Sequence, residues 1–307
     1  MSRRNMMCCV WIVLISFTMS LAACGNVETE SSEPMVEQSN NEIIEVNENV
    51  INRTEYHTEE IHCTNEGDDI YGIAYIPDSD DEKYPLVIFS HELGRTYTSG
   101  TDYAKKLAAQ GIATYTFDFR NGGPTSKSGN DLSKMSVMTE VSDLETVIAT
   151  AKTWDFVDVD KIVLIGGSQG GFVTAATAAK HTNEIAGVVL LYPAFGIAEE
   201  AHEMFSSVND IPDTYSYRGW FTAGKLYAAD VWDYDVYNEI NAYDKPVLIL
   251  HGDQDNSVDS SYSERAAEAY KDAEFHLIQG AGHGFYGTTF EEAFSYIEGY
   301  LTRIGIR

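Results

Sequence analysis

The sequence predicts an α/β protein with a mostly parallel, twisted sheet and helices on both faces. From about residue 84 onward, short apolar runs alternate with stretches of helical period, as in repeated strand and helix units. The runs YPLVIFS (84–90) and IAGVVLLYP (185–193) are apolar on successive residues, which is typical of strands buried on both faces. Residues 54–307 are numerous enough for one large core, so we expect a single domain over this range.

The expected elements follow in chain order. Residues 54–77 alternate polar and apolar positions around the turn NEGDD, which predicts an antiparallel hairpin. Strands are then expected at 84–90, 111–119, 160–167, 185–193, 245–253 and 273–279, and helices at about 100–110, 136–152, 169–180, 261–271 and 290–303.

Between about residues 195 and 244 the alternation breaks. This stretch has no clean strand or helix period but carries many aromatic residues, among them Phe205, Tyr215, Tyr217, Trp220, Phe221, Tyr227, Trp232 and Tyr234. We interpret it as an insertion into the sheet domain.

The first 23 residues have the pattern of a secretory signal peptide. Arg3 and Arg4 precede a short apolar run, and small residues follow before Cys24. The sequence LAAC resembles the lipobox of bacterial lipoproteins, in which cleavage precedes the cysteine and its thiol is lipidated. This resemblance implies an exported, cell-surface lipoprotein anchored in the membrane through Cys24. The alternatives are an ordinary signal peptide and an uncleaved anchor.

Charge and composition set further limits. Residues 24–53 form an acidic segment with seven glutamates between 25 and 50 and no aromatic residue, which predicts a disordered tether. The net charge of the whole chain is −28, so we exclude nucleic acid as a partner. Cys63 is the one cysteine after Cys24, which excludes a disulfide within residues 54–307.

The stretch LIGGSQGGF (164–172) places Ser168 where a predicted strand ends and a helix begins. Gly166 and Gly170 occupy the flanking positions of a G-x-S-x-G pattern, in which the serine sits on a strained turn with an exposed hydroxyl. The pattern alone is weak, because a surface turn or a helix start would also carry serine and glycine. The strand-to-helix context makes a nucleophile the better interpretation.

A serine nucleophile requires a histidine base and a carboxylate that orients it. His283 lies in GAGHGF, directly after a predicted strand at the carboxyl edge of the sheet. The stretch LILHGDQDNSV leaves another strand and offers Asp253, Asp255 and Asp259. The chain order of serine, aspartate and histidine fits Ser168, Asp255 and His283.

The same acidic loop has a competing interpretation as a calcium site. Its oxygen-bearing residues fall at EF-hand positions 1, 3, 5, 7 and 12, but Val258 stands where the sharp turn calls for glycine, and a strand precedes the loop. We therefore expect no metal here.

With these motifs, residues 55–303 resemble an α/β-hydrolase. The similarity is to bacterial cinnamoyl and feruloyl esterases and to monoacylglycerol lipase and serine aminopeptidase-like hydrolases. The family pattern H-G-x-x-D-x-x-V matches residues 251–258 and selects Asp255, and G-H-G-F matches residues 282–285 around His283. The resemblance implies an α/β-hydrolase fold, an acyl-enzyme mechanism at Ser168 and no cofactor.

The resemblance also implies an oxyanion hole. The family's two donors are the backbone N–H groups that fall here on Leu93, in FSHELG, and on Gln169, directly after the nucleophile. Glu92 stands where the family has glycine, and a carboxylate there opposes the charge that the hole stabilises. We expect Glu92 to point away, toward Arg95.

Two further features follow from the resemblance. DFRNGGPTSKS (118–128) is similar to a family loop, in which we expect Asp118 and Arg120 to form a structural ion pair. The insertion is expected to be a cap over the catalytic face, with some aromatics shaping the acyl or alcohol pocket and others forming the cap's own core.

The predicted function is hydrolysis of a small-molecule carboxylic ester. Two alternatives stay open. The first is a peptidase on the same fold, in which Glu199, Glu200 and Glu203 hold a substrate amine. The second is a non-enzymatic solute-binding lipoprotein, which would have no need of a serine between glycines. The acyl and alcohol groups and the oligomeric state are not predicted by the sequence.

Overall fold

The structure is a computed structural model that describes residues 54–307. The predicted signal peptide (1–23), the tether (24–53) and Cys24 lie outside this range. Across residues 54–307, no helix has the length and apolar character needed to cross a membrane.

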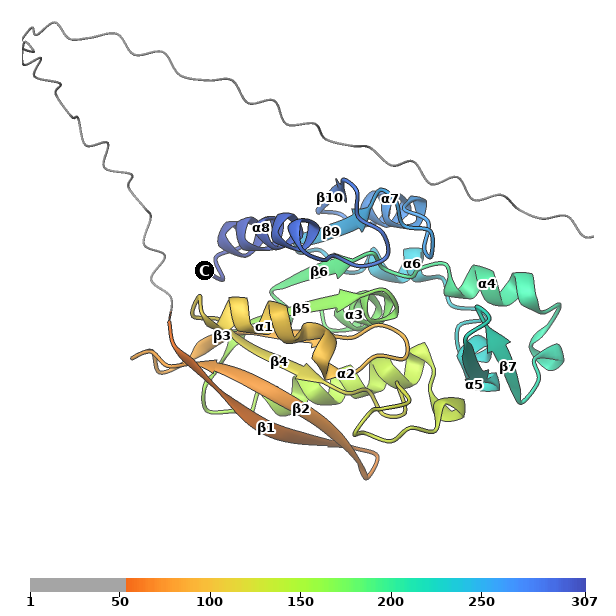
Figure 1. Cartoon of the computed structure of the whole chain (residues 1–307), viewed down its shortest axis with the longest axis horizontal. Coiled ribbons are helices and arrows are strands. Elements are labelled where there is room, and N and C mark those ends of the chain that lie inside the picture. Colours follow the sequence, from red (N-terminus) through yellow and green to blue (C-terminus); the bar gives the residue numbers. More distant parts are fainter. Residues whose placement is uncertain (1–53) are drawn as a thin grey trace, which may run out of the picture. The chain divides into compact units, whose positions relative to one another are not determined.

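Within residues 54–307 the chain forms an eight-stranded sheet of order β1-β2-β4-β3-β5-β6-β9-β10 (Figure 1). The predicted N-terminal hairpin is present, because β1 pairs with β2 in antiparallel register, and β2 pairs antiparallel with β4. All pairings from β4 to β10 are parallel. The strands are β1 (Tyr56–Asn65), β2 (Asp68–Pro77), β3 (Tyr84–Ser90), β4 (Ala113–Phe117), β5 (Val157–Gly167), β6 (Gly187–Leu191), β9 (Val247–Gly252) and β10 (Ala273–Ile278).

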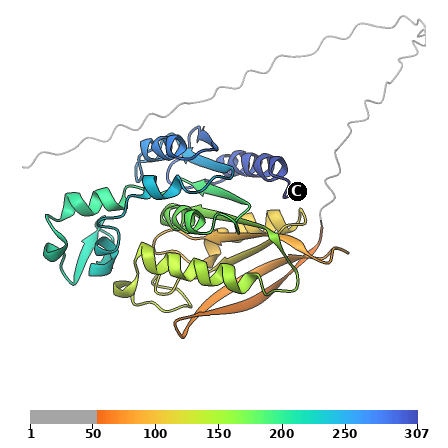
Figure 2. The ribbon, with the colours of Figure 1, turned by 180° about the vertical axis from the view of Figure 1, so that it is seen from behind.

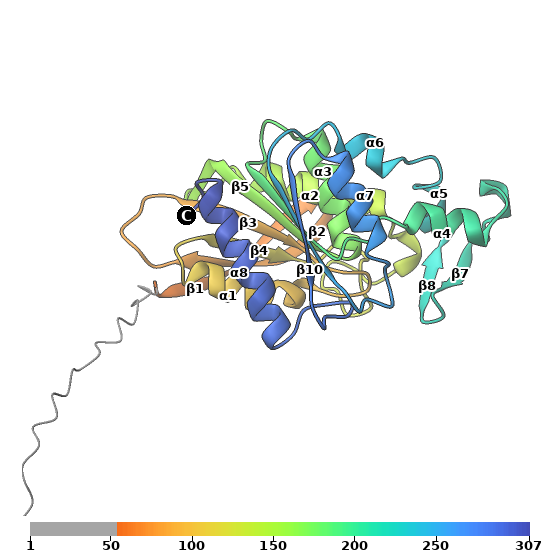
Figure 3. The same ribbon diagram turned by 90° about the horizontal axis from the view of Figure 1, so that it is seen from above.

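Helices cover both faces of this sheet, as predicted. One face packs against α1 (Thr101–Ala108) and α8 (Thr288–Arg303), with a short 3₁₀ turn, η1 (Tyr97–Gly100), before α1. The opposite face packs against α2 (Val137–Ala151), α3 (Gln169–Lys180), α6 (Val236–Ile240) and α7 (Ser261–Ala269). Figure 1 shows α1 in front of the sheet, Figure 2 shows α2 and α3 from behind, and Figure 3 shows the layers from above. The fold class is therefore confirmed.

The helix α3 has a central position. Its residues from Gln169 to Ala178 are all buried, because it lies between β5, α2 and α6. A helix that is apolar on nearly every side is typical of the interior of a large domain. The N-terminus of α3 is thereby fixed at the carboxyl edge of the sheet, where β3, β5, β6 and β9 also end.

The insertion has regular elements that the sequence pattern did not predict. They are α4 (Ile197–Met204), η3 (Val208–Asp210), the two-stranded sheet β7 (Thr214–Tyr217) and β8 (Phe221–Gly224), and α5 (Lys225–Ala229). Figures 1 and 2 show α4, β7 and α5 extending beyond the end of the main sheet. Four-residue strands and five-residue helices are too short to give a recognisable period. The last helix of the insertion, α6, returns to the body of the domain.

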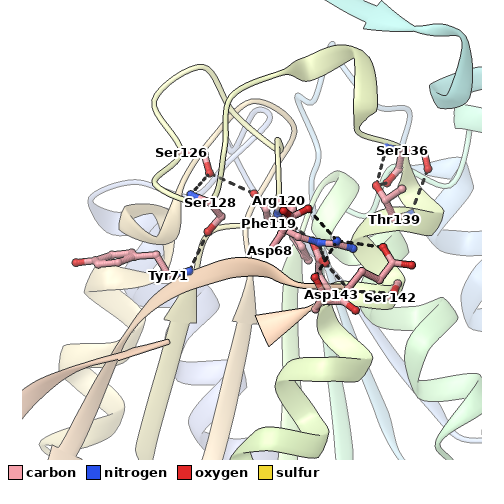
Figure 4. A network of polar contacts seen from close by, with 12 residues as sticks. Asp68, Tyr71, Phe119, Arg120, Ser126, Ser128, Ser136, Thr139, Ser142 and Asp143 are labelled. Carbon is pink, nitrogen blue, oxygen red and sulfur yellow. Dashed lines mark hydrogen bonds and ion pairs between the residues drawn. The ribbon is translucent and has the colours of Figure 1, made fainter. Parts of the chain in front are cut away.

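The predicted ion pair between Asp118 and Arg120 is wrong. The Nε of Arg120 lies 2.6 Å from Oδ1 of Asp143 on α2 (Figure 4). Its Nη1 lies 3.1 Å from Oε2 of Glu66 in the hairpin turn. Asp118 instead accepts hydrogen bonds from the backbone N–H groups of Tyr97 and Lys127, each at 2.6 Å. Both side chains thus stabilise loops, with α2 supplying the partner that sequence proximity did not indicate.

Candidate active site

Ser168 lies at a sharp turn between β5 and α3. Its backbone has φ 52° and ψ −119°, a conformation that a residue with a Cβ seldom adopts. Gly167 is the last residue of β5 and Gln169 is the first of α3, so the chain reverses from strand to helix at this one residue. Such strain clusters at functional sites, where the surrounding structure holds it in place.

The two glycines of the motif are required by close packing. A Cβ on Gly166 would lie 2.2 Å from the carbonyl oxygen of Gly170, and one on Gly170 would lie 2.3 Å from the carbonyl oxygen of Ser90. Each obstructing atom belongs to the backbone, so a side chain at either position would displace the turn. The turn and the strand β3 can therefore approach this closely only with glycine at both positions.

The structure brings together the three residues that the motifs selected. The Oγ of Ser168 lies 2.9 Å from Nε2 of His283, and Nδ1 of His283 lies 2.7 Å from Oδ2 of Asp255. Asp255 is in the loop after β9 and His283 is in the loop after β10. The carboxylate accepts from Nδ1–H, which leaves Nε2 as the acceptor for the serine hydroxyl. Three residues from distant parts of the chain thus form one continuous hydrogen-bonded series.

Asp255 is held as a carboxylate by several donors. Its Oδ1 accepts from the N–H of Ser257 at 2.8 Å and of Val258 at 3.0 Å, and Nε2 of His251 lies 3.2 Å from its Oδ2. Burial by itself raises the pKa of Asp255, but the hydrogen bonds from His251, His283 and Val258 outweigh it and hold the pKa below its ordinary value. The group that faces His283 is therefore ionised at neutral pH.

The neighbouring acids of this loop have structural contacts. Asp253 accepts from the N–H of Gly280 at 2.6 Å, and Asp259 accepts from the N–H of Ser261 at 2.9 Å. Among residues 54–307, no group of three or more His, Cys, Asp or Glu side chains is arranged to hold a metal ion. The loop geometry is thus that of a turn that supports Asp255.

Leu93 and Gln169, the two predicted oxyanion donors, line the same pocket as Ser168. Gln169 is the first residue of α3, where backbone N–H groups lack partners within the helix. The N–H of Leu93 makes no hydrogen bond with any group in residues 54–307. Both residues therefore lie in the wall of the Ser168 pocket, and their role as oxyanion donors stays a prediction.

His91 fixes the loop that leads to Leu93, a role that its motif position alone did not reveal. Its Nδ1 lies 2.8 Å from the carbonyl oxygen of Glu92, and its Nε2 accepts from the N–H of Phe119 at 3.2 Å. Burial lowers the pKa of His91, which keeps the ring neutral with the hydrogen on Nδ1. The buried imidazole thereby holds the backbone one residue before Leu93, the predicted first oxyanion donor.

The predicted orientation of Glu92 toward Arg95 is wrong. Glu92 lines the pocket with Ser168, and its Oε1 accepts a hydrogen bond from the hydroxyl of Tyr192 at 3.0 Å. Burial raises the pKa of Tyr192 well above its ordinary value, so the phenol remains a donor. The Tyr192 ring also packs edge-on against His283, with 5.0 Å between ring centroids. The pair therefore belongs to the wall of the site beside the histidine.

The side chain of Gln169 joins a buried network that sequence reasoning missed. Its Nε2 donates to Oε2 of Glu140 at 2.7 Å, and its Oε1 accepts from the hydroxyl of Tyr227 at 2.7 Å. All three residues are almost fully buried. Glu140 comes from α2 and Tyr227 from α5 of the insertion, so this network links the Ser168 turn to both elements. One signal for this network was available in the sequence. Glu140 occupies a position that the helical period of α2 places on the buried side.

The pocket beside Ser168 has a volume of about 560 Å³ and lies between the body and the insertion. From the insertion, Tyr217, Trp220 and Tyr227 line it, and Tyr286 lines it from the loop after His283. Trp220 is 65% exposed and Tyr286 is 76% exposed, so both lie at the open mouth. Other aromatics of the insertion form its own core with Ala201, Ile211 and Ala228, namely Phe205, Tyr215 and Trp232. Some aromatics of the insertion thus line the pocket and others form its own core, while a role in an acyl or alcohol pocket stays a prediction.

Sequence comparisons identify protein families and individual proteins that are similar to this chain. The profile described as "Serine aminopeptidase, S33" matches residues 81–228, and the profile described as "alpha/beta hydrolase fold" matches residues 218–288. Over 110 residues the chain is 31% identical to the quorum-quenching protein AidA of Acinetobacter baumannii (strain MDR-ZJ06), covering 36% of this chain and 35% of AidA. Over 110 residues it is 33% identical to the uncharacterized protein YcjY of Escherichia coli (strain K12), covering 34% of this chain and 35% of YcjY. The chain thus matches about a third of the length of each relative.

Solved structures give a more extensive match. The structure of Est1E from Butyrivibrio proteoclasticus with ferulic acid bound superposes with a TM-score of 0.72 at 25% identity, covering 80% of this chain and 99% of Est1E. The strand order, the turn at Ser168 and these matches show that the chain has the α/β-hydrolase fold. Within that class it resembles the esterase-like members represented by Est1E.

Proposed function

We propose that the protein is a serine hydrolase that cleaves carboxylic esters of small molecules through an acyl-enzyme. The observation that carries the proposal is the series from Ser168 Oγ to His283 Nε2 at 2.9 Å and from His283 Nδ1 to Asp255 Oδ2 at 2.7 Å. Ser168 and His283 line the same pocket as Leu93 and Gln169. The similarity to Est1E, which was solved with ferulic acid, supports an ester as the substrate.

The geometry supports the following sequence of steps. His283 Nε2 accepts the proton of Ser168 as Oγ attacks the ester carbonyl, and Asp255 stabilises the imidazolium that forms. The N–H groups of Leu93 and Gln169 bind the oxyanion, and His283 then returns its proton to the leaving alcohol. Water attacks the acyl-enzyme by the same route and regenerates Ser168. The residues involved supply every proton transfer, so no cofactor has a role in this scheme.

The peptidase alternative is favoured by the description of one matching profile but not by the acidic residues of α4. Glu199 lies 2.8 Å from Nη1 of Arg265, and Glu200 is ion-paired with Arg218. Two of the three carboxylates proposed to hold a substrate amine are thus already neutralised by arginine. A comparison of aminoacyl p-nitroanilides with p-nitrophenyl esters distinguishes the two activities, and we expect turnover of the esters.

The test uses the purified protein, p-nitrophenyl acetate and butyrate, a fluorophosphonate label and intact mass measurement. We expect turnover and a single adduct at Ser168, and we expect Ser168→Ala to show neither, with a loss of rate of about a million-fold. Ser99→Ala, which removes another serine of the pocket wall, is the matched control and should retain the label. If the wild type and Ser168→Ala are both folded and equally inert, the serine hydrolase proposal fails and ligand binding becomes the better one.

We also propose that the protein is exported and anchored in the membrane through a lipid on Cys24. This part rests on the sequence LAAC and on Arg3 and Arg4 before the apolar run. In a bacterial host, metabolic labelling with an alkyne fatty acid should mark the wild type and fractionate it with membranes. Cys24→Ser should lose both label and membrane association. Labelling that persists in Cys24→Ser would refute the assignment.

A further inference from the structure

A second hollow lies directly beside the pocket that contains Ser168. It has a volume of about 690 Å³ and lies between α4 and the loop that carries Asp255. Tyr217, Arg218 and Ser257 line both this hollow and the 560 Å³ pocket. These three residues are therefore the wall that the two spaces share.

Arg218 closes this wall by joining three segments. Its Nη1 donates to the carbonyl oxygen of Ser257 at 2.5 Å, and its Nε donates to the hydroxyl of Tyr217 at 3.2 Å. Its Nη2 is ion-paired with Glu200, whose other oxygen accepts from Tyr217 at 2.5 Å. The partners come from α4, from β7 and from the loop after Asp255. A planar guanidinium with several donors is suited to such a multiple contact, whereas a single ammonium is not.

The backbone at Arg218 is also unusual. Arg218 has φ 51° in the turn between β7 and β8, and Gly219 follows with φ 77°. A left-handed conformation is uncommon for an arginine and persists where surrounding contacts hold it. From this turn, the side chain reaches Glu200 and Ser257, which both lie outside the short sheet that carries it.

The second hollow has a largely polar lining. It includes the carboxylates of Glu203 and Asp259 together with the polar groups of Asn256 and Tyr262. Neither Glu203 nor Asp259 has a cationic partner within residues 54–307. Such a lining favours uncharged polar or cationic groups and opposes anionic ones.

We propose that Arg218 joins the insertion to the Asp255 loop and that this connection sets the length of substrate that the site accepts. With Arg218 in place, an ester is confined to the pocket beside Ser168. When Arg218 is released, the two spaces join into one cleft, and the second hollow takes the extended part of a longer ester that carries hydroxyl, amide or ammonium groups. This inference rests on the proposed ester hydrolysis.

The test compares kcat/KM for short and long esters in the wild type, Arg218→Ala and Arg265→Ala. One substrate series lengthens the acyl group of p-nitrophenyl esters, the other lengthens the alcohol of acetate esters, and the longest members end in an amino or a carboxylate group. Arg265 is the matched control, because it also joins α4 to the body through Glu199 but lines neither hollow. Thermal unfolding of each variant shows whether it is folded.

We expect Arg218→Ala to raise the ratio of long-ester to short-ester kcat/KM by about tenfold or more in one of the two series, since each additional buried group changes the rate by at least that factor. The increase in kcat/KM should be larger for amino-terminated esters than for carboxylate-terminated esters. Glu200→Gln, which weakens the ion pair but keeps Arg218, should move the ratio in the same direction and replaces Arg218→Ala if that variant does not fold.

Two results would overturn the inference. One is an unchanged ratio in both series, and the other is an equal change in Arg265→Ala, which would indicate general loosening of the insertion. Failure of the proposed function has a different signature, because the wild type would then not turn over even p-nitrophenyl acetate.

Discussion

The imidazole Nε2 of His251 lies 3.2 Å from Oδ2 of Asp255, the same carboxylate oxygen that faces His283. That Nε2 is also 3.1 Å from the carbonyl oxygen of Val258, so both of its neighbours are acceptors and it must carry a hydrogen. The other ring nitrogen lies 2.7 Å from the hydroxyl of Ser263 on α7. A second histidine thus contacts the buried aspartate at the same oxygen as His283 and helps to hold it in position.

Replacing His251 with phenylalanine should make the fold more sensitive to acid. Because the folded-state pKa of Asp255 is depressed, its carboxylate stabilises the fold above the ordinary pKa, and this stability is lost as the pH falls through the folded pKa. Losing the His251 donor raises that folded pKa. The acid unfolding midpoint of His251→Phe, followed by circular dichroism, should therefore move to higher pH.

The matched control for this variant is Ser263→Ala. It removes the contact at Nδ1 of His251 but leaves Nε2 facing Asp255. We expect a smaller shift of the acid midpoint than in His251→Phe. Equal shifts in the two variants would mean that general packing around His251 is responsible, and not the hydrogen bond to Asp255.

Asp255→Asn should reduce kcat on p-nitrophenyl acetate by about 10⁴-fold if the proposed mechanism holds. The amide cannot stabilise an imidazolium, and its NH₂ group favours the wrong tautomer of His283. Asp253→Asn is the control, because it changes the same loop and keeps an oxygen to accept from Gly280. Steady-state kinetics should show that this control stays within a few-fold of wild type. A comparable loss in both variants would contradict the assignment of Asp255.

Much of the fold could be predicted because its signals are local. The central strands β3 and β6 of the parallel sheet are apolar on both faces and are buried along nearly their whole length. The helix α3 begins at Gln169 and ends at Lys180, the bounds predicted from the sequence. The insertion was located but its elements were not predicted, because they are stabilised by tertiary contacts such as those of Tyr227.

The candidate site was predicted where a motif carries the chemistry and missed where contacts are long-range. Ser168, Asp255 and His283 each sit in a short pattern at a strand end, and the fold brings them into hydrogen-bonding distance. The partner of Glu92 is Tyr192, a hundred residues later in the chain, and no local pattern links them. The catalytic roles of Ser168, Asp255 and His283 stay predictions until activity is measured.

Gly170→Ala should disrupt the site, whereas Gly299→Ala should not. A Cβ on Gly170 would lie 2.3 Å from the carbonyl oxygen of Ser90 and 2.4 Å from that of His91, so the Ser168 turn must shift. We expect about 1–3 kcal/mol of destabilisation and a loss of fluorophosphonate labelling. At Gly299, in the interior of α8, a Cβ meets nothing within 4 Å.

Alanine at position 299 should therefore raise stability by about 0.5–1 kcal/mol through its higher helix propensity. Urea denaturation of the two variants measures both effects. If Gly170→Ala is as stable and as readily labelled as wild type, the turn is more adaptable than the close contacts imply.

Glu140→Gln should be more stable than the wild type, by a difference in the free energy of unfolding that grows as the pH rises. Burial raises the pKa of Glu140 well above its ordinary value of 4.5, the nearby Asp143 carboxylate adds to this effect, and the hydrogen bond from Gln169 opposes it. A raised folded pKa means that the stabilising contribution of the protonated group is complete below pH 4.5 and is lost as the pH rises toward the folded pKa. Each pH unit in that window costs the wild type about 1.4 kcal/mol.

Glutamine keeps the acceptor for Gln169 and has no proton to lose. The free energy of unfolding, measured with urea at pH 5, 7 and 9, should therefore favour Glu140→Gln increasingly over wild type. Glu145→Gln, on the same helix but part of a surface ion pair with Lys180, should differ from wild type by no more than about 1 kcal/mol at each pH. A difference between Glu140→Gln and wild type that stays constant with pH would show that Glu140 is ionised in the fold, and its buried network with Gln169 and Tyr227 would then have to hold a full negative charge beside the Ser168 turn.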